Sequence, residues 1–489
     1  MRVLLIQPGF VEIYGSFRHL YKRGFLNPPL SLCYMAAALE QAGHHAGLID
    51  AEAEALSLDA LAGRAQAFAP DLIGYTATSV DYAQAVAAAR RLKQALPAVP
   101  AIIGGVHANL FGARIMTEEP VFDFAACGDG EPLIAALADA LAEGADPGAS
   151  LPARLAAIPG LIYRDEAGDV AAVPPVRATR HLDDYPQPAR HLLNDALYVR
   201  AVPRRGRVVT ATCMTSRGCP YGCIYCATDA KPEGRLTRFR SAANVLDELE
   251  EIVKGRGITH VAFNDDCLTL KKDRMVELCE GIHARGLDFT WEGLSRGDLV
   301  TPELLRTMRR AGLVRLSFGI ESGDPDILAT VNKGETLDHI EAGLRWAKEA
   351  GIVTRGSVII GLPYETRASV RRTFRYITDL KTLDQVNINI LQPYPGTKVA
   401  RMTERGEGGT RLIPTPARNP LDAGGQLRRF GSASVAVNDL TPERLVTLQK
   451  IGFFRFYLRP RALWNNLKIA GWRVCFQDGL ALLRSLVGA

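Results

Sequence analysis

The chain has 489 residues and a formal net charge of +5, with 47% hydrophobic and 23% charged residues. A length of this order predicts roughly three domains, and the composition is typical of a globular protein. The charge is too small to indicate nucleic-acid binding, no apolar run reaches the ~20 residues that span a bilayer, and no cleavable signal follows Met1. Nine cysteines, an odd number, favour a reducing cytoplasm in which cysteines serve metal binding or catalysis.

Residues 1–145 alternate between short apolar runs and segments with helical periodicity. This alternation is typical of a doubly wound parallel sheet, the Rossmann-like α/β class. The expected strands are 2–8, 44–50, 71–78, 101–107 and 123–130, and the expected helices are 29–43, 58–68 and 81–96.

The carboxyl ends of parallel strands form the ligand-binding edge of such a sheet. Four expected strand ends carry glycine, hydroxyl or other polar residues, and glycine lets the backbone approach a ligand closely. One such loop could be an ordinary turn, but four at one edge indicate a binding surface. The candidate residues are Gln7, Thr76, Thr78, Ser79, Gly104, Gly105, His107, Gly128 and Glu131.

Residues 146–205 are rich in proline and predict a linker with one short strand pair over 160–173. A second alternation over 206–400 predicts six β/α units, which make a partial (β/α)6 barrel. Its expected strands are 207–216, 257–266, 288–295, 313–321, 354–363 and 384–395.

Residues 401–489 predict a C-terminal loop and helical region. The stretch 401–435 is rich in glycine, arginine and proline and predicts a loop. The stretch 441–460 has helical spacing, with Thr441 as its expected N-cap.

Cys219, Cys223 and Cys226 form the most specific motif of the chain. Structural zinc sites use four ligands, and a disulfide would need an oxidising compartment. A four-iron cluster held by three thiolates leaves one iron open to bind another molecule. The alternative is a zinc knuckle with Cys213 as fourth ligand, although Cys213 falls inside an expected strand, where its side chain would pack.

The Cys-x3-Cys-x-aromatic-Cys spacing, with Tyr225 before the last cysteine, resembles the signature of the radical S-adenosylmethionine (SAM) superfamily. The resemblance implies that the open iron chelates SAM. It also implies that an external donor such as flavodoxin or ferredoxin supplies the electron that cleaves SAM into methionine and a 5′-deoxyadenosyl radical.

Three later segments resemble the SAM-binding segments of that family. Asp265 and Asp266 stand where the family often has Gly-Gly-Glu, and 316–323 resembles its fourth-strand segment. The segment 356–366 resembles the one that lies along adenine. The residues implied in SAM binding are Tyr225, Asp265, Asp266, Ser317, Glu321 and Gly361.

The segments 28–51, 101–116 and 127–131 closely resemble the radical SAM branch whose first domain binds cobalamin. The resemblance assigns the candidate residues at the four strand ends to cobalamin. The Asp-x-His-x-x-Gly motif that places a histidine under cobalt is absent. His107 is the possible substitute, although a histidine in such a loop is more often a structural hydrogen-bonding group. A first domain that binds nothing is the alternative.

The resemblance implies methylation of an unactivated carbon or phosphorus centre of a biosynthetic intermediate by methylcobalamin and a substrate radical. Cyclisation, ring contraction or oxygen insertion without methyl transfer is the alternative. Methylthiolation is disfavoured, since only Cys33 and Cys127 precede residue 200 and a second cluster needs three cysteines. A non-enzymatic electron carrier would leave the SAM segments without a purpose.

The tail 453–489 mixes aromatic residues and leucine with arginine and lysine, a composition that suits an interfacial helix. The alternative is a helical cap packed on the barrel. The expected substrate is a small or lipid-like molecule, and the tail is a candidate for peripheral membrane contact. Its basic residues are Arg455, Arg459, Arg461, Lys468 and Arg473.

Overall fold

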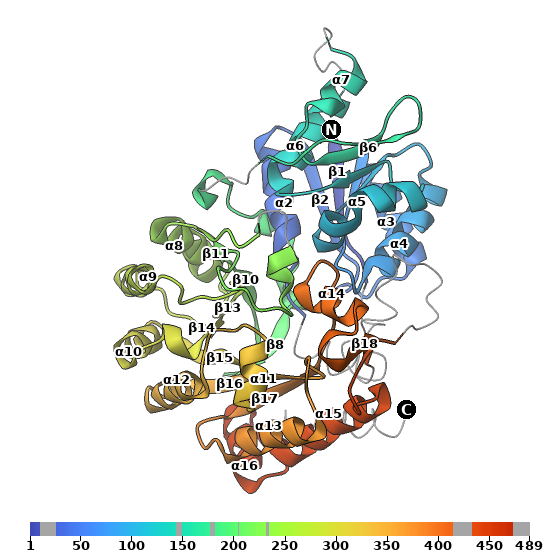
Figure 1. Ribbon diagram of the computed structural model, residues 1–489. Coiled ribbons are helices and arrows are strands. Elements are labelled where there is room, and N and C mark those ends of the chain that lie inside the picture. Colours follow the sequence, from blue (N-terminus) through green and yellow to red (C-terminus); the bar gives the residue numbers. More distant parts are fainter. Residues whose placement is uncertain are drawn as a thin grey trace.

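The computed structural model describes residues 1–9, 26–142, 149–176, 181–203, 205–230, 234–413 and 433–472. Two sheets dominate the fold (Figure 1). The N-terminal sheet lies in the upper part of the view, the barrel lies below it, and the C-terminal helices lie at the bottom. The predicted α/β class is confirmed.

The first sheet has seven strands in the order β2-β1-β3-β4-β5-β6-β7. The first five are parallel, as predicted. The strand pair predicted in the linker is present as an antiparallel hairpin, and it extends this sheet beside β5. The strands are β1 (Arg2–Gln7), β2 (His45–Asp50), β3 (Leu72–Thr76), β4 (Ala101–Gly104), β5 (Phe124–Ala126), β6 (Leu161–Arg164) and β7 (Val170–Ala172).

Helices cover both faces of this sheet, so its parallel strands are apolar on both sides. Leu5 and Ile102 pack on one face with α2 (Leu30–Gln41), α6 (Gly130–Leu141) and α7 (Leu151–Ala156). Leu4 and Ile103 pack on the other face, which is covered by the remaining helices. These are α3 (Leu58–Phe68), α4 (Tyr82–Ala95) and α5 (Val106–Glu118).

The strand predicted over 101–107 is too long, because β4 ends at Gly104 and α5 begins at Val106. Gly105 makes the turn between them with φ +94°, a conformation that favours glycine. A Cβ there would lie 2.6 Å from the Ala77 carbonyl oxygen. The close approach of the β3 and β4 loops therefore requires this glycine.

The strand predicted over 207–216 is divided into three. Its first part is β9 (Gly206–Val209), which pairs antiparallel with β8 (Val199–Val202). Thr210 then donates its N–H to the Tyr198 carbonyl at 2.8 Å, which ends that ladder. β10 (Ala211–Cys213) joins the barrel, and β11 (Ser216–Arg217) pairs with β12 (Arg238–Phe239).

The barrel sheet has six strands in the order β10-β13-β14-β15-β16-β17, and every neighbouring pair is parallel. The predicted six-stranded barrel is confirmed. Side chains alternate between its outer and inner faces, so Leu316 and Phe318 belong to the core while Ser317 faces the interior. The later strands are β13 (His260–Phe263), β14 (Thr290–Ser295), β15 (Leu313–Glu321), β16 (Val353–Ile360) and β17 (Gln385–Ile390).

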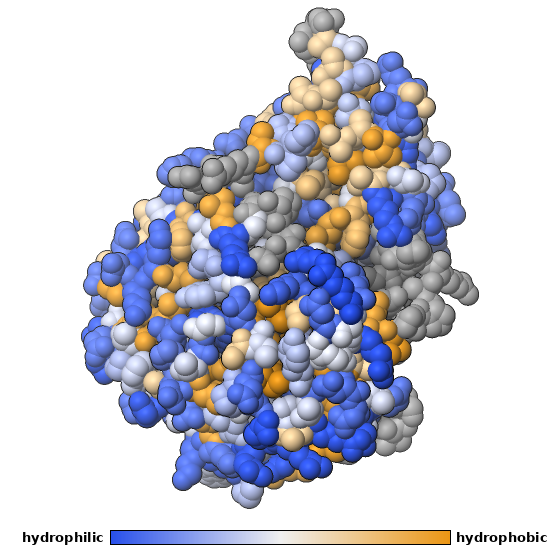
Figure 2. Space-filling model, in the orientation of Figure 1, coloured by the Kyte–Doolittle hydropathy of each residue, from blue (hydrophilic) through white to orange (hydrophobic). Residues whose placement is uncertain are grey.

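Amphipathic helices surround the barrel sheet (Figure 1). Figure 2 shows that their outer surface is largely hydrophilic. They are α8 (Ala242–Glu250), α9 (Lys272–Ala284), α10 (Pro302–Arg310), α11 (Pro325–Thr330), α12 (Leu337–Glu349) and α13 (Arg367–Asp379).

The loop predicted over 401–435 is wrong in its first part. α14 (Lys398–Glu404) continues into it, and β18 (Thr410–Leu412) pairs with β19 (Val435–Val437). The many glycines and arginines of this stretch are typical of a loop, so the sequence did not predict these short elements. Residues 414–432 lie outside the described part of the chain.

Two C-terminal helices, α15 (Pro442–Tyr457) and α16 (Pro460–Ala470), pack on the barrel. The predicted N-cap of α15 is confirmed, since the Thr441 side chain accepts from the Arg444 N–H at 3.3 Å. The Tyr457 hydroxyl accepts from the Val386 N–H at 3.0 Å and donates to the Val386 carbonyl at 2.9 Å, which covers the open edge of β17. Among the described residues, no helix has the length and apolar character needed to cross a membrane.

Candidate functional site

The three clustered cysteines lie in the loop that follows β11. Gly218 starts this loop with φ +90°, and a Cβ there would lie 2.1 Å from the Leu236 carbonyl oxygen. The Ile224 N–H donates to the Val331 carbonyl at 3.1 Å, and the Ile224 carbonyl accepts from the Val399 N–H at 2.9 Å. The loop is thus anchored to the barrel on one side and to α14 on the other.

The thiols of Cys219, Cys223 and Cys226 are half-buried neighbours. Cys226 interacts electrostatically with each of the other two. Burial raises the pKa of the Cys219 thiol and raises the pKa of Cys223 to about 11. Bound iron would displace these protons. Three adjacent thiols on one anchored loop fit the three protein ligands of a four-iron cluster.

Cys213 is fully buried in β10 within the barrel core, as the sequence predicted. Within the described ranges, no three His, Cys, Asp or Glu side chains are placed to hold a single metal ion. The zinc alternative needs Cys213 as its fourth ligand, and the burial of that thiol in the barrel core argues against it.

A buried charged group lies beside the cysteine loop at the carboxyl end of β15. Glu321 is 7% exposed and has φ +61°, a strained conformation for a residue with a Cβ. Its carboxylate lies 3.4 Å from the Lys333 ammonium. The pKa of Tyr225 is raised well above its ordinary value by burial and by the adjacent Glu321 and Cys223. Sequence reasoning missed Lys333, because lysine is normally exposed.

The adjacent acids Asp265 and Asp266 have different surroundings. Asp265 is 4% exposed and accepts hydrogen bonds from the Thr215 N–H, from the Thr215 hydroxyl at 2.7 Å and from the Ser216 hydroxyl at 2.5 Å. Asp266 is exposed and lines a cavity. Asp265 thus fixes the chain that leads into the cysteine loop, while only Asp266 faces the cavity.

The other two residues implied in SAM binding lie on neighbouring strands. Ser317 is half-buried in the middle of β15, in register with Arg355 of β16. Gly361 follows β16 with φ +89°, and its N–H donates to the Glu365 carboxylate at 2.5 Å. The structure brings Tyr225 and Glu321 together with Cys223, whereas Ser317 lies about four residues lower along the barrel interior.

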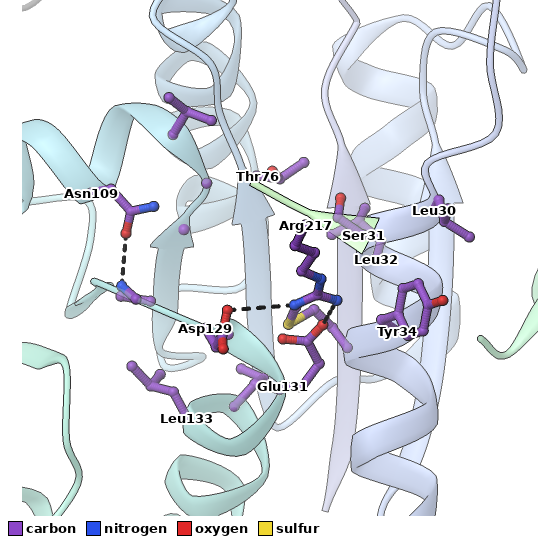
Figure 3. Close-up of a pocket in the computed structure, with 18 of the residues that line it drawn as sticks. Leu30, Ser31, Leu32, Tyr34, Thr76, Asn109, Asp129, Glu131, Leu133 and Arg217 are labelled. Atoms are coloured by element: carbon purple, nitrogen blue, oxygen red, sulfur yellow. Dashed lines mark hydrogen bonds and ion pairs between the residues drawn. The ribbon is translucent and has the colours of Figure 1, made fainter. Parts of the chain in front are cut away.

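A cavity of about 420 Å³ lies between the first sheet and the barrel. Five predicted cobalamin residues line it: Thr76, Gly104, Gly105, Gly128 and Glu131. Residues in and next to β11 and residues after β13 also line it: Met214, Ser216, Arg217, Gly218, Asn264 and Asp266. Figure 3 shows Arg217 beside Asp129 and Glu131. Four other predicted residues, Gln7, Thr78, Ser79 and His107, are outside this lining. The chain that follows Gln7 lies outside the described residues after Gly9.

His107 is fully buried in α5, with its ring centroid 4.2 Å from that of Tyr82 and 4.9 Å from that of Phe111. Its Nδ1 lies 3.1 Å from the Ser79 hydroxyl oxygen. Burial lowers the pKa of His107 to about 4, so the imidazole is neutral at neutral pH. These contacts are those of a structural histidine.

One wall of the cavity is an ion-pair network that joins the β11–β12 strand pair to the acids that follow β5 (Figure 3). Arg217, two residues before Cys219, pairs with Glu131 and lies 3.5 Å from Asp129. Arg238 pairs with Asp129 at 2.5 Å, and the Tyr185 hydroxyl donates to Asp129 at 2.8 Å. Burial alone would raise the pKa of Asp129, but these partners hold it below its usual value. Sequence reasoning missed Arg217, Arg238 and Asp129, because nothing local marks ion pairs across domains.

Residues 214–377 match the model of the radical SAM superfamily, and residues 20–138 match that of the B12 binding domain. A Pyrococcus horikoshii protein named as an uncharacterized methyltransferase is 31% identical over 469 residues, which are 96% of this chain and 95% of that protein. The anaerobic magnesium-protoporphyrin IX monomethyl ester cyclase of Rubrivivax gelatinosus is 28% identical, over 81% of this chain and 68% of the cyclase.

The fold also resembles that of the radical SAM methyltransferase TsrM from Kitasatospora setae, solved with cobalamin and a [4Fe-4S] cluster. The TM-score is 0.67 at 21% identity, and the match covers 86% of this chain and 81% of TsrM. The chain belongs to the cobalamin-binding radical SAM enzymes.

Proposed function

We propose that this protein is a cobalamin-dependent radical SAM methyltransferase that methylates an unactivated carbon or phosphorus centre of a small molecule. The observation that carries the proposal is the cavity, whose walls join the strand ends of the first sheet to residues next to the cysteine loop. Two large cofactors bound on these two sides would meet in one space. The Pyrococcus relative, matched over nearly its whole length, favours methyl transfer.

Cys219, Cys223 and Cys226 would hold a [4Fe-4S] cluster, which with SAM supplies a carbon-centred radical. The Glu321 carboxylate would accept from the amino group of SAM, and Lys333, whose ammonium lies 3.4 Å away, orients that carboxylate. Tyr225, Asp266, Ser317 and Gly361 are the further SAM candidates. Asp265 would act through Thr215 and Ser216, which it fixes before the cysteine loop. A flavodoxin- or ferredoxin-like protein would supply the electron.

We assign cobalamin to the first domain, residues 1–145. Thr76, Gly104, Gly105, Gly128 and Glu131 would surround the ring at the strand ends. The cavity continues below those ends to apolar side chains of the sheet, α2 and α6, which suits the nucleotide tail of the cofactor. These side chains are Leu5, Leu32, Ile102, Leu133 and Ile134. Four other candidates are outside the cavity lining and would support the strand-end loops that form it: Gln7, Thr78, Ser79 and His107.

No histidine is expected to ligate cobalt from below, because His107 points into the packing of α5. His107→Ala and the milder His107→Gln should bind as much cobalamin as the wild type. Electron paramagnetic resonance of the cob(II)alamin form should show no nitrogen superhyperfine splitting. Splitting that disappears in His107→Ala would overturn the ligation claim, and a wild-type protein that cannot be loaded with cobalamin would overturn the cofactor assignment.

A cyclisation without methyl transfer is the second candidate, favoured by the similarity to the Rubrivivax cyclase. Anaerobic incubation of reconstituted enzyme with cell extracts, followed by mass spectrometry, separates the two. A methyltransferase gives a product that is heavier by one methylene unit. When methyl-deuterated SAM is supplied, the added methyl group carries the deuterium. A product that has only lost hydrogen or gained oxygen would exclude methylation and support the second candidate.

We also propose that α16 contacts an anionic membrane surface. One side of the helix packs on the barrel, where Asn465 donates to Asp384 at 3.0 Å and Ala462 is 3% exposed. Its other side exposes large apolar residues, with Leu463 at 53% and Trp464 at 57%. Arg461 and Lys468 are exposed on the same helix, with the Lys468 ammonium 5.0 Å from the Trp464 ring centroid, and Arg455 is exposed on α15, which suits anionic headgroups. Arg473 and the rest of the tail lie outside the described residues.

Full-length protein should therefore sediment with phosphatidylglycerol vesicles more than with phosphatidylcholine vesicles. Each buried Leu or Trp side chain contributes about 1.5–3 kcal/mol, so Leu463→Ser/Trp464→Ser should lower vesicle binding at least about tenfold. Leu58→Ser, at a 45% exposed leucine on α3, is the control. Equal binding of the double variant and the control would refute the contact.

A further inference from the structure

The amino end of the barrel interior holds more positive than negative charge. Arg200 pairs with one oxygen of Glu292 at 2.9 Å, and Arg315 pairs with the other. All three side chains are more than nine-tenths buried. His260 is near the same carboxylate, but burial lowers its pKa to about 4, so it is neutral. Two arginines thus share a single carboxylate.

A third arginine, Arg355, adds to this excess. Among the described residues, its guanidinium donates to the amide oxygen of Gln385 alone, at 3.3 and 3.4 Å. No carboxylate of the described residues is within ion-pair distance of it. The buried Nε of Arg315 has no hydrogen-bond partner. Burial, and after it the charge of Arg355, lowers the pKa of Arg315 to about 9. Buried charges normally have counter-charges, so this end of the barrel would stabilise a bound anion.

A polar column leads from these arginines toward the cysteine loop. The inward positions Ser317, Ser357, Gln385 and Asn387 are partly exposed, whereas the alternating positions, such as Val358 and Val386, are buried. Arg355 is in register with Ser317, four residues before Glu321. At ~3.3 Å of rise per residue, Arg355 lies about 13 Å below the Glu321 end, and Arg315 lies further below it on the same strand.

We propose that Arg355, with Arg315, binds an anionic group of the substrate, a carboxylate or a phosphoryl group, at the amino end of the barrel interior. A guanidinium binds either group through two parallel hydrogen bonds. The substrate class is therefore an elongated anion, whose reacting centre lies near Glu321 and the cysteine loop. This inference rests on the proposed function, in which Glu321 and the cysteine loop hold the radical-forming cofactors at the carboxyl end of the barrel.

The test uses the reconstituted holoenzyme under anaerobic conditions, with inorganic phosphate and succinate as probes and chloride at equal ionic strength as reference. One or both probes should raise the Tm of the wild type, and the probe that does so identifies the phosphoryl or the carboxylate source. Arg355→Gln should weaken this binding at least about tenfold, as loss of about 1.4 kcal/mol does. Arg355→Lys should retain part of it. Arg371→Gln, at an exposed arginine of α13, should match the wild type.

Equal Tm shifts in Arg355→Gln and wild type, or no shift of the wild type with either probe, would overturn the inference. Iron content, cobalamin content and 5′-deoxyadenosine formation, measured in the same samples, should be unchanged by Arg355→Gln. A wild type that lacks these cofactor properties but still binds the probes through Arg355 would overturn the proposed function instead.

Discussion

Replacing Cys219, Cys223 and Cys226 by alanine is expected to abolish the broad visible absorption of the anaerobically reconstituted protein and all formation of 5′-deoxyadenosine. Among the described residues, no other thiol lies on this loop, so no other side chain there can replace the three ligands of the four-iron cluster. Iron and sulfide analysis, the absorption spectrum and chromatography of the SAM products measure the outcome.

Cys213→Ala is the matched control, because that thiol is buried in the barrel core only six residues before Cys219. It should keep the cluster, at a modest cost in stability. A triple variant that retains four irons per chain would exclude the assignment, and loss of the metal in Cys213→Ala would revive the zinc alternative.

Glu321→Gln is expected to suppress SAM binding and cleavage while the iron content stays intact. Removing one partner of a buried charged pair costs about 2–5 kcal/mol, which corresponds to a loss of affinity of roughly 30-fold or more. Equilibrium binding of SAM to the reconstituted protein and the rate of 5′-deoxyadenosine formation measure the effect. Glu303→Gln, at an exposed acid of α10, should leave both unchanged.

Asp265→Asn provides a second comparison. Because Asp265 holds Thr215 and Ser216, its loss should loosen the approach to Cys219 and reduce the iron retained, with a smaller direct effect on SAM affinity. Unchanged SAM cleavage in Glu321→Gln would mean that this strained glutamate has a structural role only.

The sequence predicted the two sheets well because each parallel strand is a local apolar run bounded by polar loops. It failed where long-range pairing decides the outcome. The stretch 207–216 has uniform strand character, yet a hydrogen bond from Thr210 to Tyr198 assigns its first half to a separate hairpin. The strand pair near 160–173 was found, but its attachment to β5 depends on contacts that no local pattern records.

The same contrast applies to the site. Spacing alone was sufficient to select the three cysteines, since all three lie on one loop. Asp265 and Asp266 were treated as a pair, although adjacent residues in extended chain point to opposite sides and only one of them could face the cavity. The arginines of the barrel interior come from separate strands, so their clustering could not be recognised before the register of β15 and β16 was known.

The ion pairs of Arg217 and Arg238 with Glu131 and Asp129 have a consequence for how this enzyme can change during evolution. The cysteine-bearing half of the chain carries both cations, and the other half carries both anions. A barrel transferred to a chain without those acids would expose two unpaired, partly buried guanidinium groups beside its cysteine loop. Exchange of one half for another would therefore have to restore these charge partners as well.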